Sequence, residues 1–205
     1  IQERDIQYNI ENDLPLPESL TQVDGDLFLG DYSHPLIKGL TQVGGDLDLY
    51  GYDHSLPSGL TQVGGDLFLH GYPHPLPEDL TQVGGDLSLE GYDHPLPAEL
   101  HVSRNLDLFG YDHSLPEGLH VGGHLFLSGY SHLLPEGLHV GGGLNLYGYE
   151  HPLPEGLHVG GDLDLDNYPH PLPEDIQVEG KIYGLSNYQH ELPKSLQNKV
   201  EQIKL

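Results

Sequence analysis

The sequence predicts an all-β repeat solenoid of about nine coils built from short parallel strands. A Tyr-x-His pair recurs nine times, from Tyr32 and His34 to Tyr188 and His190, at intervals of 20 and later 19 residues. The 28 glycines and 17 prolines recur at fixed positions of the repeat, as corner residues do. Between these corners, leucine and valine alternate with residues that point the other way, which is typical of strands with one buried face.

Residues 1–18 differ from the repeat and are expected to cap the first coil. Their apolar residues Ile1, Ile6, Tyr8 and Ile10 suggest a strand that covers the open edge of the stack. The repeats follow over residues 19–190. We interpret residues 1–205 as one solenoid domain that ends in a C-terminal cap over 191–205.

One coil is represented by residues 119–137. Leu119 and Val121 alternate with an outward residue, and so do Leu125 and Leu127, which predicts two short strands. The glycine pair between them predicts a tight corner where a positive φ favours glycine. A further leucine and a Pro-Glu-Gly turn return the chain to the next coil, so each coil offers about five inward apolar side chains.

The coils come in two lengths. The early ones read Leu-Thr-Gln-Val, first at residues 20–23, and the later ones read Leu-His-Val, first at residues 100–102. The leucine and the valine are both expected to point inward, so the extra residue must be absorbed between them. We therefore expect a bulge in the early coils.

The C-terminal end is also irregular. The coil over Ile176–Leu185 carries what is interpreted as an insertion at its end, Ile-Tyr-Gly-Leu. Beyond it, Leu196, Val200 and Ile203 recur at helical spacing after Ser195, a residue type that commonly caps helices. This pattern predicts a short amphipathic C-terminal capping helix.

Composition and motifs argue against several classes of function. The chain holds 32 Asp and Glu against 7 Lys and Arg, a formal net charge of −25, so we expect no nucleic-acid partner. No apolar run approaches membrane-spanning length, so no membrane insertion is expected. Without cysteine there is no disulfide framework or thiol chemistry. No catalytic or phosphate-binding motif is found, so the protein is expected not to be an enzyme.

The histidines of the Tyr-x-His pairs are predicted to form a row. Alternation with Leu134 suggests that His132 and Tyr130 point inward. The imidazoles could then be hydrogen-bonded within the stack, could share a divalent metal, or could be exposed without a role. Because stacked rings cannot all be charged cheaply, we expect destabilisation below about pH 6. The row consists of His34, His54, His74, His94, His113, His132, His151, His170 and His190.

A second set of histidines lies between the inward Leu and Val of the later coils. His101, His120, His139 and His158 are expected to point outward in register, which makes them candidate ligands for a divalent metal. The alternative is a solvated strand face. No other cofactor is expected.

Two outward positions vary while the rest of the repeat stays constant. They are the middle residue of each Leu-x-Leu and the residue that follows the second leucine. Several exposed aromatic side chains on one sheet face suggest a contact site. The candidate binding residues are Phe28, Tyr50, Phe68, His70, Phe109, Phe126 and Tyr147.

At Leu134–Leu138, which reads L-P-E-G-L and is followed by Leu144-x-Leu146, the chain resembles leucine-rich repeats of the short bacterial and viral L-P-x-x-L kind. The resemblance covers roughly residues 14–196. It departs from the family where Tyr149 stands in place of the usual asparagine, and where a second strand is expected. The resemblance implies a binding or scaffolding role without catalysis, and it names no ligand.

Three functions therefore remain open. The first is a structural or self-assembling scaffold at a surface or outside the cell, in which an acidic N-terminal end meets a tail that contains Lys194 and Lys199 and the chain joins itself head to tail. The second is a module that binds another protein through the variable positions. The third is an acidic mimic of a polyanion, for which a row of glutamates in register is the argument. That row consists of Glu117, Glu136, Glu155 and Glu174.

Overall fold

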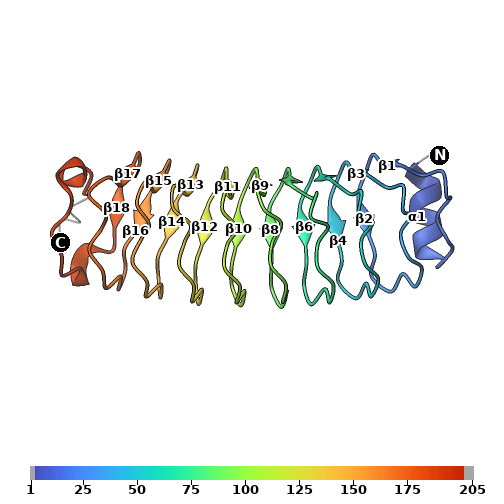
Figure 1. Ribbon diagram of the computed structural model, residues 1–205, viewed down its shortest axis with the longest axis horizontal. Coiled ribbons are helices and arrows are strands. Elements are labelled where there is room, and N and C mark those ends of the chain that lie inside the picture. Colours follow the sequence, from blue (N-terminus) through green and yellow to red (C-terminus); the bar gives the residue numbers. More distant parts are fainter. Residues whose placement is uncertain (1–2, 201–205) are drawn as a thin grey trace.

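The computed structural model describes residues 3–200 and shows a rod of stacked coils (Figure 1). Each coil contributes one two-residue strand to each of two nine-stranded parallel sheets, which confirms the predicted solenoid of about nine coils. The first sheet contains β1 (Gln22–Val23), β3 (Gln42–Val43), β5 (Gln62–Val63), β7 (Gln82–Val83), β9 (His101–Val102), β11 (His120–Val121), β13 (His139–Val140), β15 (His158–Val159) and β17 (Gln177–Val178).

The second sheet lies across the core from the first and is formed by the Leu-x half of each Leu-x-Leu. Its strands pair in register, so that Leu87, Leu106 and Leu125 form one continuous column. The strands are β2 (Leu27–Phe28), β4 (Leu47–Asp48), β6 (Leu67–Phe68), β8 (Leu87–Ser88), β10 (Leu106–Asp107), β12 (Leu125–Phe126), β14 (Leu144–Asn145), β16 (Leu163–Asp164) and β18 (Ile182–Tyr183).

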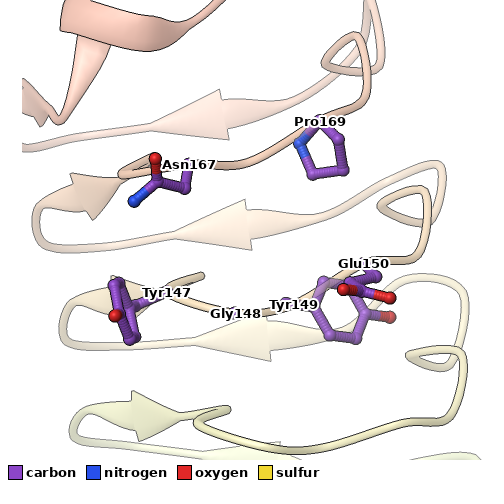
Figure 2. Close-up of a pocket in the computed structure, with 6 residues that line it drawn as sticks. All are labelled: Tyr147, Gly148, Tyr149, Glu150, Asn167 and Pro169. Carbon is purple, nitrogen blue, oxygen red and sulfur yellow. The ribbon is translucent and has the colours of Figure 1, made fainter.

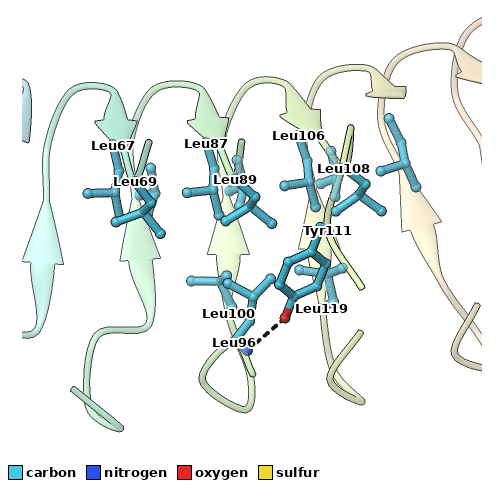
Figure 3. Packing of buried hydrophobic residues seen from close by; sticks show 14 of the residues in the cluster. Leu67, Leu69, Leu87, Leu89, Leu96, Leu100, Leu106, Leu108, Tyr111 and Leu119 are labelled. Atoms are coloured by element: carbon cyan, nitrogen blue, oxygen red, sulfur yellow. Dashed lines mark hydrogen bonds between the residues drawn. The ribbon is translucent and has the colours of Figure 1, made fainter. Parts of the chain in front are cut away.

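The core lies between the two sheets and is filled by columns of identical side chains (Figure 3). A coil buries six apolar residues, because the tyrosine of the Tyr-x-His pair points inward as predicted and joins the five expected leucine and valine side chains. No charged residue of the described range is buried, so the interior carries no unpaired charge to offset. In the sixth coil the buried residues are Leu119, Val121, Leu125, Leu127, Tyr130 and Leu134.

The buried tyrosines join successive coils by hydrogen bonds as well as by packing. The Tyr111 hydroxyl accepts a hydrogen bond from the Leu96 backbone N–H at 3.1 Å (Figure 3). It also donates one to the His94 carbonyl at 3.1 Å. Both partners belong to the preceding coil. Burial raises the pKa of Tyr92, the equivalent residue one coil earlier, to about 12, so these hydroxyls stay protonated and able to donate. Each buried tyrosine from Tyr52 to Tyr168 thereby satisfies backbone groups of the preceding coil.

The glycine pairs are required by close stacking and not by a positive φ. Gly122 and Gly123 are not in the left-handed region, which corrects the expectation for this corner. A Cβ at Gly141 would overlap the carbonyl oxygen of Gly122 in the preceding coil. Glycine is therefore favoured here because the backbones of two coils approach each other closely.

The difference in coil length is absorbed in a turn. Gln82 pairs with His101 and Val83 with Val102, so the first sheet continues in register across the change and the expected bulge is not found there. The early return turns close with a hydrogen bond such as Leu80 N–H to the Pro77 carbonyl, at 3.1 Å. The Leu-His-Val coils instead follow a turn with a residue in the left-handed region, and three of these four residues are glycines. They are Glu99, Gly118, Gly137 and Gly156.

The N-terminal cap is a helix and not the expected strand. Helix α1 (Glu3–Glu11) lies against the first coil (Figure 1). Its residues Ile6 and Ile10 are buried and Tyr8 is exposed. The two isoleucines are four residues apart and therefore share one helical face, whereas Tyr8 points away from it. Ile1, which was also assigned to the cap, lies outside the described residues.

The C-terminal end differs from the prediction as well. Ile182 and Tyr183 form strand β18 and pair in register with Leu163 and Asp164, so they belong to the repeat and are not an insertion. The chain then forms the 3-10 turns η1 (Leu185–Asn187) and η2 (Lys194–Leu196). Val200 makes an isolated bridge to β18, and no capping helix forms within the described residues of this segment. Ile203 lies outside them. No helix in residues 3–200 is long and apolar enough to cross a membrane.

Candidate functional site

The residues that vary between coils gather on the outer surface of the second sheet and at the turn beside it. We call this surface the variable face. Its sheet column consists of Phe28, Asp48, Phe68, Ser88, Asp107, Phe126, Asn145, Asp164 and Tyr183. Its turn column, two residues further along each coil, consists of Gly30, Tyr50, His70, Glu90, Phe109, Ser128, Tyr147 and Asp166.

The variable face carries most of the exposed aromatic surface in the described part of the chain. Tyr50, Phe109 and Tyr147 are 61%, 57% and 55% exposed, and Phe28 and Phe126 are also exposed. The structure places all seven candidate binding residues on this face, including the half-buried Phe68 and the exposed His70. The repeat thus supplies a constant framework, and its outward positions present aromatic rings to solvent.

Aromatic residues occupy one of the two columns in a coil but not both. Where the sheet position is Phe28, Phe68 or Phe126, the turn position is glycine, histidine or serine. Where the turn position is aromatic, the sheet position is aspartate or asparagine. One aromatic residue from these columns appears in seven of the nine coils: Phe28, Tyr50, Phe68, Phe109, Phe126, Tyr147 and Tyr183.

The aspartates on the sheet fix the backbone of the aromatic turn residues. Asp48 Oδ1 accepts a hydrogen bond from the Tyr50 N–H at 2.9 Å, and Asp107 Oδ1 accepts one from the Phe109 N–H at 2.9 Å. The Asn145 side-chain oxygen plays the same role for the next aromatic turn residue at 2.8 Å. These are Asx turns, in which a short side chain bonds the backbone two residues further on. Each ring is therefore held beside a polar side-chain group.

A single histidine also takes part in the turn column. The His70 ring packs edge-on against the Tyr50 ring of the preceding coil, with 5.3 Å between centroids. Its Nδ1 atom lies 3.4 Å from Glu90 Oε2 in the following coil. An aromatic ring, an imidazole and a carboxylate thus follow one another along the rod.

A hollow of about 510 Å³ lies beside the turn column between two successive coils (Figure 2). Tyr147 and Glu150 line it from one coil, and Asn167 and Pro169 line it from the next. The hollow is open to solvent and combines an exposed aromatic ring with an exposed carboxylate.

The histidines of the Tyr-x-His pairs are half-buried or exposed at the edge of the rod, and not inward as predicted. The ring of His94 donates through Nε2 to the Pro73 carbonyl of the preceding coil at 2.8 Å. His132 contacts Asp112 Oδ1 at 2.9 Å in the same way. Hydrogen bonds to the Asp112 carboxylate, first of all the one from His132, lower the pKa of that carboxyl group. Eight of the nine rings make such a bond: His34, His54, His74, His94, His113, His132, His170 and His190.

The second histidine set forms a column on the outer surface of the first sheet, as predicted. The ring centroids of His101, His120, His139 and His158 are 4.3, 4.9 and 4.6 Å apart in succession. The last of them also contacts Glu179 Oε1 at 3.1 Å. Across residues 3–200, no three His, Cys, Asp or Glu side chains converge in a way that could hold a metal ion. The column therefore offers stacked imidazoles and not the three or four convergent ligands of a zinc centre.

This column predicts a pH dependence of stability. Burial lowers the pKa of His120, and the neighbouring His101 and His139 lower it further. Between this lowered value and the ordinary value of about 6.5, the unfolded chain binds more protons, so stability is lost as the pH falls through this window. We expect the melting temperature to fall less between pH 7.5 and pH 5 when all four column histidines are replaced by glutamine.

The early coils provide the control for this experiment, because they carry glutamine at the same position on the first sheet, as in Gln62 and Gln82. The substitution therefore fits the fold. An equal drop in melting temperature for the native chain and the glutamine variant would place the acid sensitivity elsewhere.

Three features of this region were not predicted from the sequence. The backbone hydrogen bonds that Asp48 and Asp107 accept could have been predicted from the Asp-x-aromatic spacing, which is typical of an Asx turn. Tyr183 was assigned to an insertion, although it continues the sheet column. The hollow beside Tyr147 depends on two coils at once, and no single repeat indicates it.

Comparison with known proteins identifies no relative of this chain. The chain matches no family model. No curated protein and no solved structure is significantly similar to it.

Proposed function

We propose that the protein is a non-enzymatic repeat scaffold that binds a partner protein through the variable face. The observation that carries this proposal is the set of outward aromatic residues on an otherwise constant framework, one in each of seven coils, of which five are exposed and two are half-buried. Exposed aromatic side chains are enriched where proteins bind one another, because they bury a large area at a small cost in conformational entropy. Rigid parallel strands hold these rings at fixed intervals.

Head-to-tail self-assembly is the second candidate, and the N-terminal end supports it less well. Stacking one rod on another requires an open sheet edge at each end. Helix α1 lies across the first coil and buries Ile6 and Ile10 there. A cap of this kind prevents further coils from joining.

The resemblance to leucine-rich repeats forms part of the same proposal. The Leu-x-Leu strand followed by a Leu-Pro return turn supports it, and that family implies binding through a sheet. Here a second parallel sheet and a buried tyrosine complete each coil. We therefore propose a binding solenoid that is similar to that family in its repeat and distinct in its second sheet.

Removal of two central rings tests the binding role. We expect Phe68→Ala combined with Phe126→Ala to reduce the capture of partner proteins at least tenfold, because aromatic anchors at an interface each contribute on the order of 2 kcal/mol. Capture by the immobilised chain from an extract of its source organism, quantified by mass spectrometry, measures this.

Two exposed apolar residues outside the variable face supply the matched control. Tyr8 is 59% and Leu133 is 63% exposed, and alanine at both should leave capture unchanged. If the control variant loses the same proteins, capture reflects non-specific hydrophobic adsorption and the proposal fails.

A further inference from the structure

We propose that the partner of the variable face is an extended segment rich in lysine and arginine that lies along the axis of the rod. This inference rests on the proposed function and specifies the chemistry of the partner. The two columns of the variable face contain five carboxylates and no lysine or arginine. The carboxylates are Asp48, Glu90, Asp107, Asp164 and Asp166.

The aromatic rings and the carboxylates are close neighbours on this face. Asp48 lies in register between Phe28 and Phe68 on the adjacent strands, and Asp107 is paired with Phe126. A cationic side chain within about 6 Å of a ring centroid is attracted by the ring face. At these positions the same cation would also meet a carboxylate, so arginine and lysine satisfy both parts of the surface.

The hollow beside Tyr147 extends the same combination to the edge of the face (Figure 2). It is lined by the exposed Tyr147 ring and the Glu150 carboxylate. The ring and the carboxylate lie at opposite ends of the hollow in Figure 2, so one basic side chain of a bound segment would stack on the ring and another would pair with the carboxylate. A neutral apolar side chain would leave the Glu150 carboxylate without an ionic partner.

The spacing of the aspartates favours an extended occupant. Asp48, Asp107 and Asp164 lie on β4, β10 and β16, which are three strands apart in the sheet order. Three strand spacings amount to about 14 Å, and four residues of an extended chain span about 13 Å. Residues four apart in an extended chain also point to the same side. The occupant is therefore expected to present a cationic side chain at every fourth residue.

A synthetic peptide tests this geometry. The probe is a nine-residue peptide of glycine and serine with arginine at positions 1, 5 and 9, and its isomer carries the three arginines at positions 1, 2 and 3. We expect the spaced peptide to bind at least threefold more tightly in an NMR titration at 0.15 M salt. Replacing the three aspartates by asparagine should weaken its binding about tenfold, since each exposed ion pair contributes modestly.

Asparagine is a conservative replacement, because Asn145 already occupies the same position and accepts the same backbone hydrogen bond. The charge-matched control removes three exposed glutamates of the return turns by Glu117→Gln, Glu136→Gln and Glu155→Gln. This variant should weaken binding less than twofold. Equal weakening in both variants, or equal binding of the two peptides, overturns the proposal because general electrostatic attraction then explains the result.

Two further outcomes separate this inference from the proposed function. If the peptide does not bind but partner capture is still lost with Phe68→Ala and Phe126→Ala, the cationic partner is refuted and protein binding stands. Binding of a neutral oligosaccharide, cellohexaose, that depends on Tyr50 and Phe109 but not on the aspartates would identify a glycan surface and overturn the cationic partner.

Discussion

Replacing Tyr111 by alanine should lower the free energy of unfolding by about 3–5 kcal/mol, the range found when large aromatic side chains are removed from a core. Tyr111 is 1% exposed and lies in the central part of the stack. Its loss leaves a cavity and also removes the hydroxyl that satisfies the Leu96 N–H and the His94 carbonyl. Urea unfolding followed by circular dichroism measures the change.

A second variant separates packing from hydrogen bonding at this position. Tyr111→Phe keeps the ring and removes only the hydroxyl, which should cost about 1–3 kcal/mol because a buried N–H loses its partner. The exposed Tyr50→Phe should have almost no effect. If Tyr111→Phe is as mild as Tyr50→Phe, the bonds between coils do not contribute to stability.

Placing charges under the N-terminal cap should have a comparable effect at the end of the rod. Ile6→Asp combined with Ile10→Asp would require two carboxylates to enter an apolar contact, so α1 should detach from the first coil. We expect the amides of the first coils, Leu20 to Leu49, to exchange at least tenfold faster with deuterium. Hydrogen exchange with mass spectrometry measures this, because stability varies along a repeat protein.

The control places the same number of charges on the outer side of the cap. Tyr8→Asp combined with Leu14→Asp changes two exposed apolar side chains and should leave exchange in the first coils unaltered. The exposed edge of β1 and β2 should also promote association in the Ile6 and Ile10 variant, seen as a sedimentation coefficient that rises with concentration. If exchange is unchanged in the first coils, α1 is not a cap.

The sequence was sufficient for the regular part of the fold, because every coil repeats the same pattern and stacks on a copy of itself. The nine coils, the two strands in each coil and the outward position of His120 all follow from alternation. The predictions for the two ends of the rod were wrong, because the repeat pattern does not extend to these segments. Ile6, Tyr8 and Ile10 fit a strand by alternation, yet Ile6 and Ile10 also share a helical face, and only packing on the first coil distinguishes the two.

Interactions between coils were the second source of error. The sequence of one repeat does not show how closely Gly141 approaches the backbone of Gly122, so the reason for glycine was misassigned. In the candidate site, the aromatic positions were predicted because they vary within a constant frame. The hydrogen bond from Tyr50 to Asp48 and the hollow beside Tyr147 required coordinates.

In-register stacking also determines how a chain of this kind can change its length. A duplicated coil inserted in the interior brings its own six buried side chains and meets matching neighbours above and below. Gain or loss of a whole coil therefore needs no compensating change in the core, whereas loss of part of a coil would break every column. The reach of the variable face can thus be adjusted in steps of about 4.8 Å by copying or deleting a short segment of coding sequence.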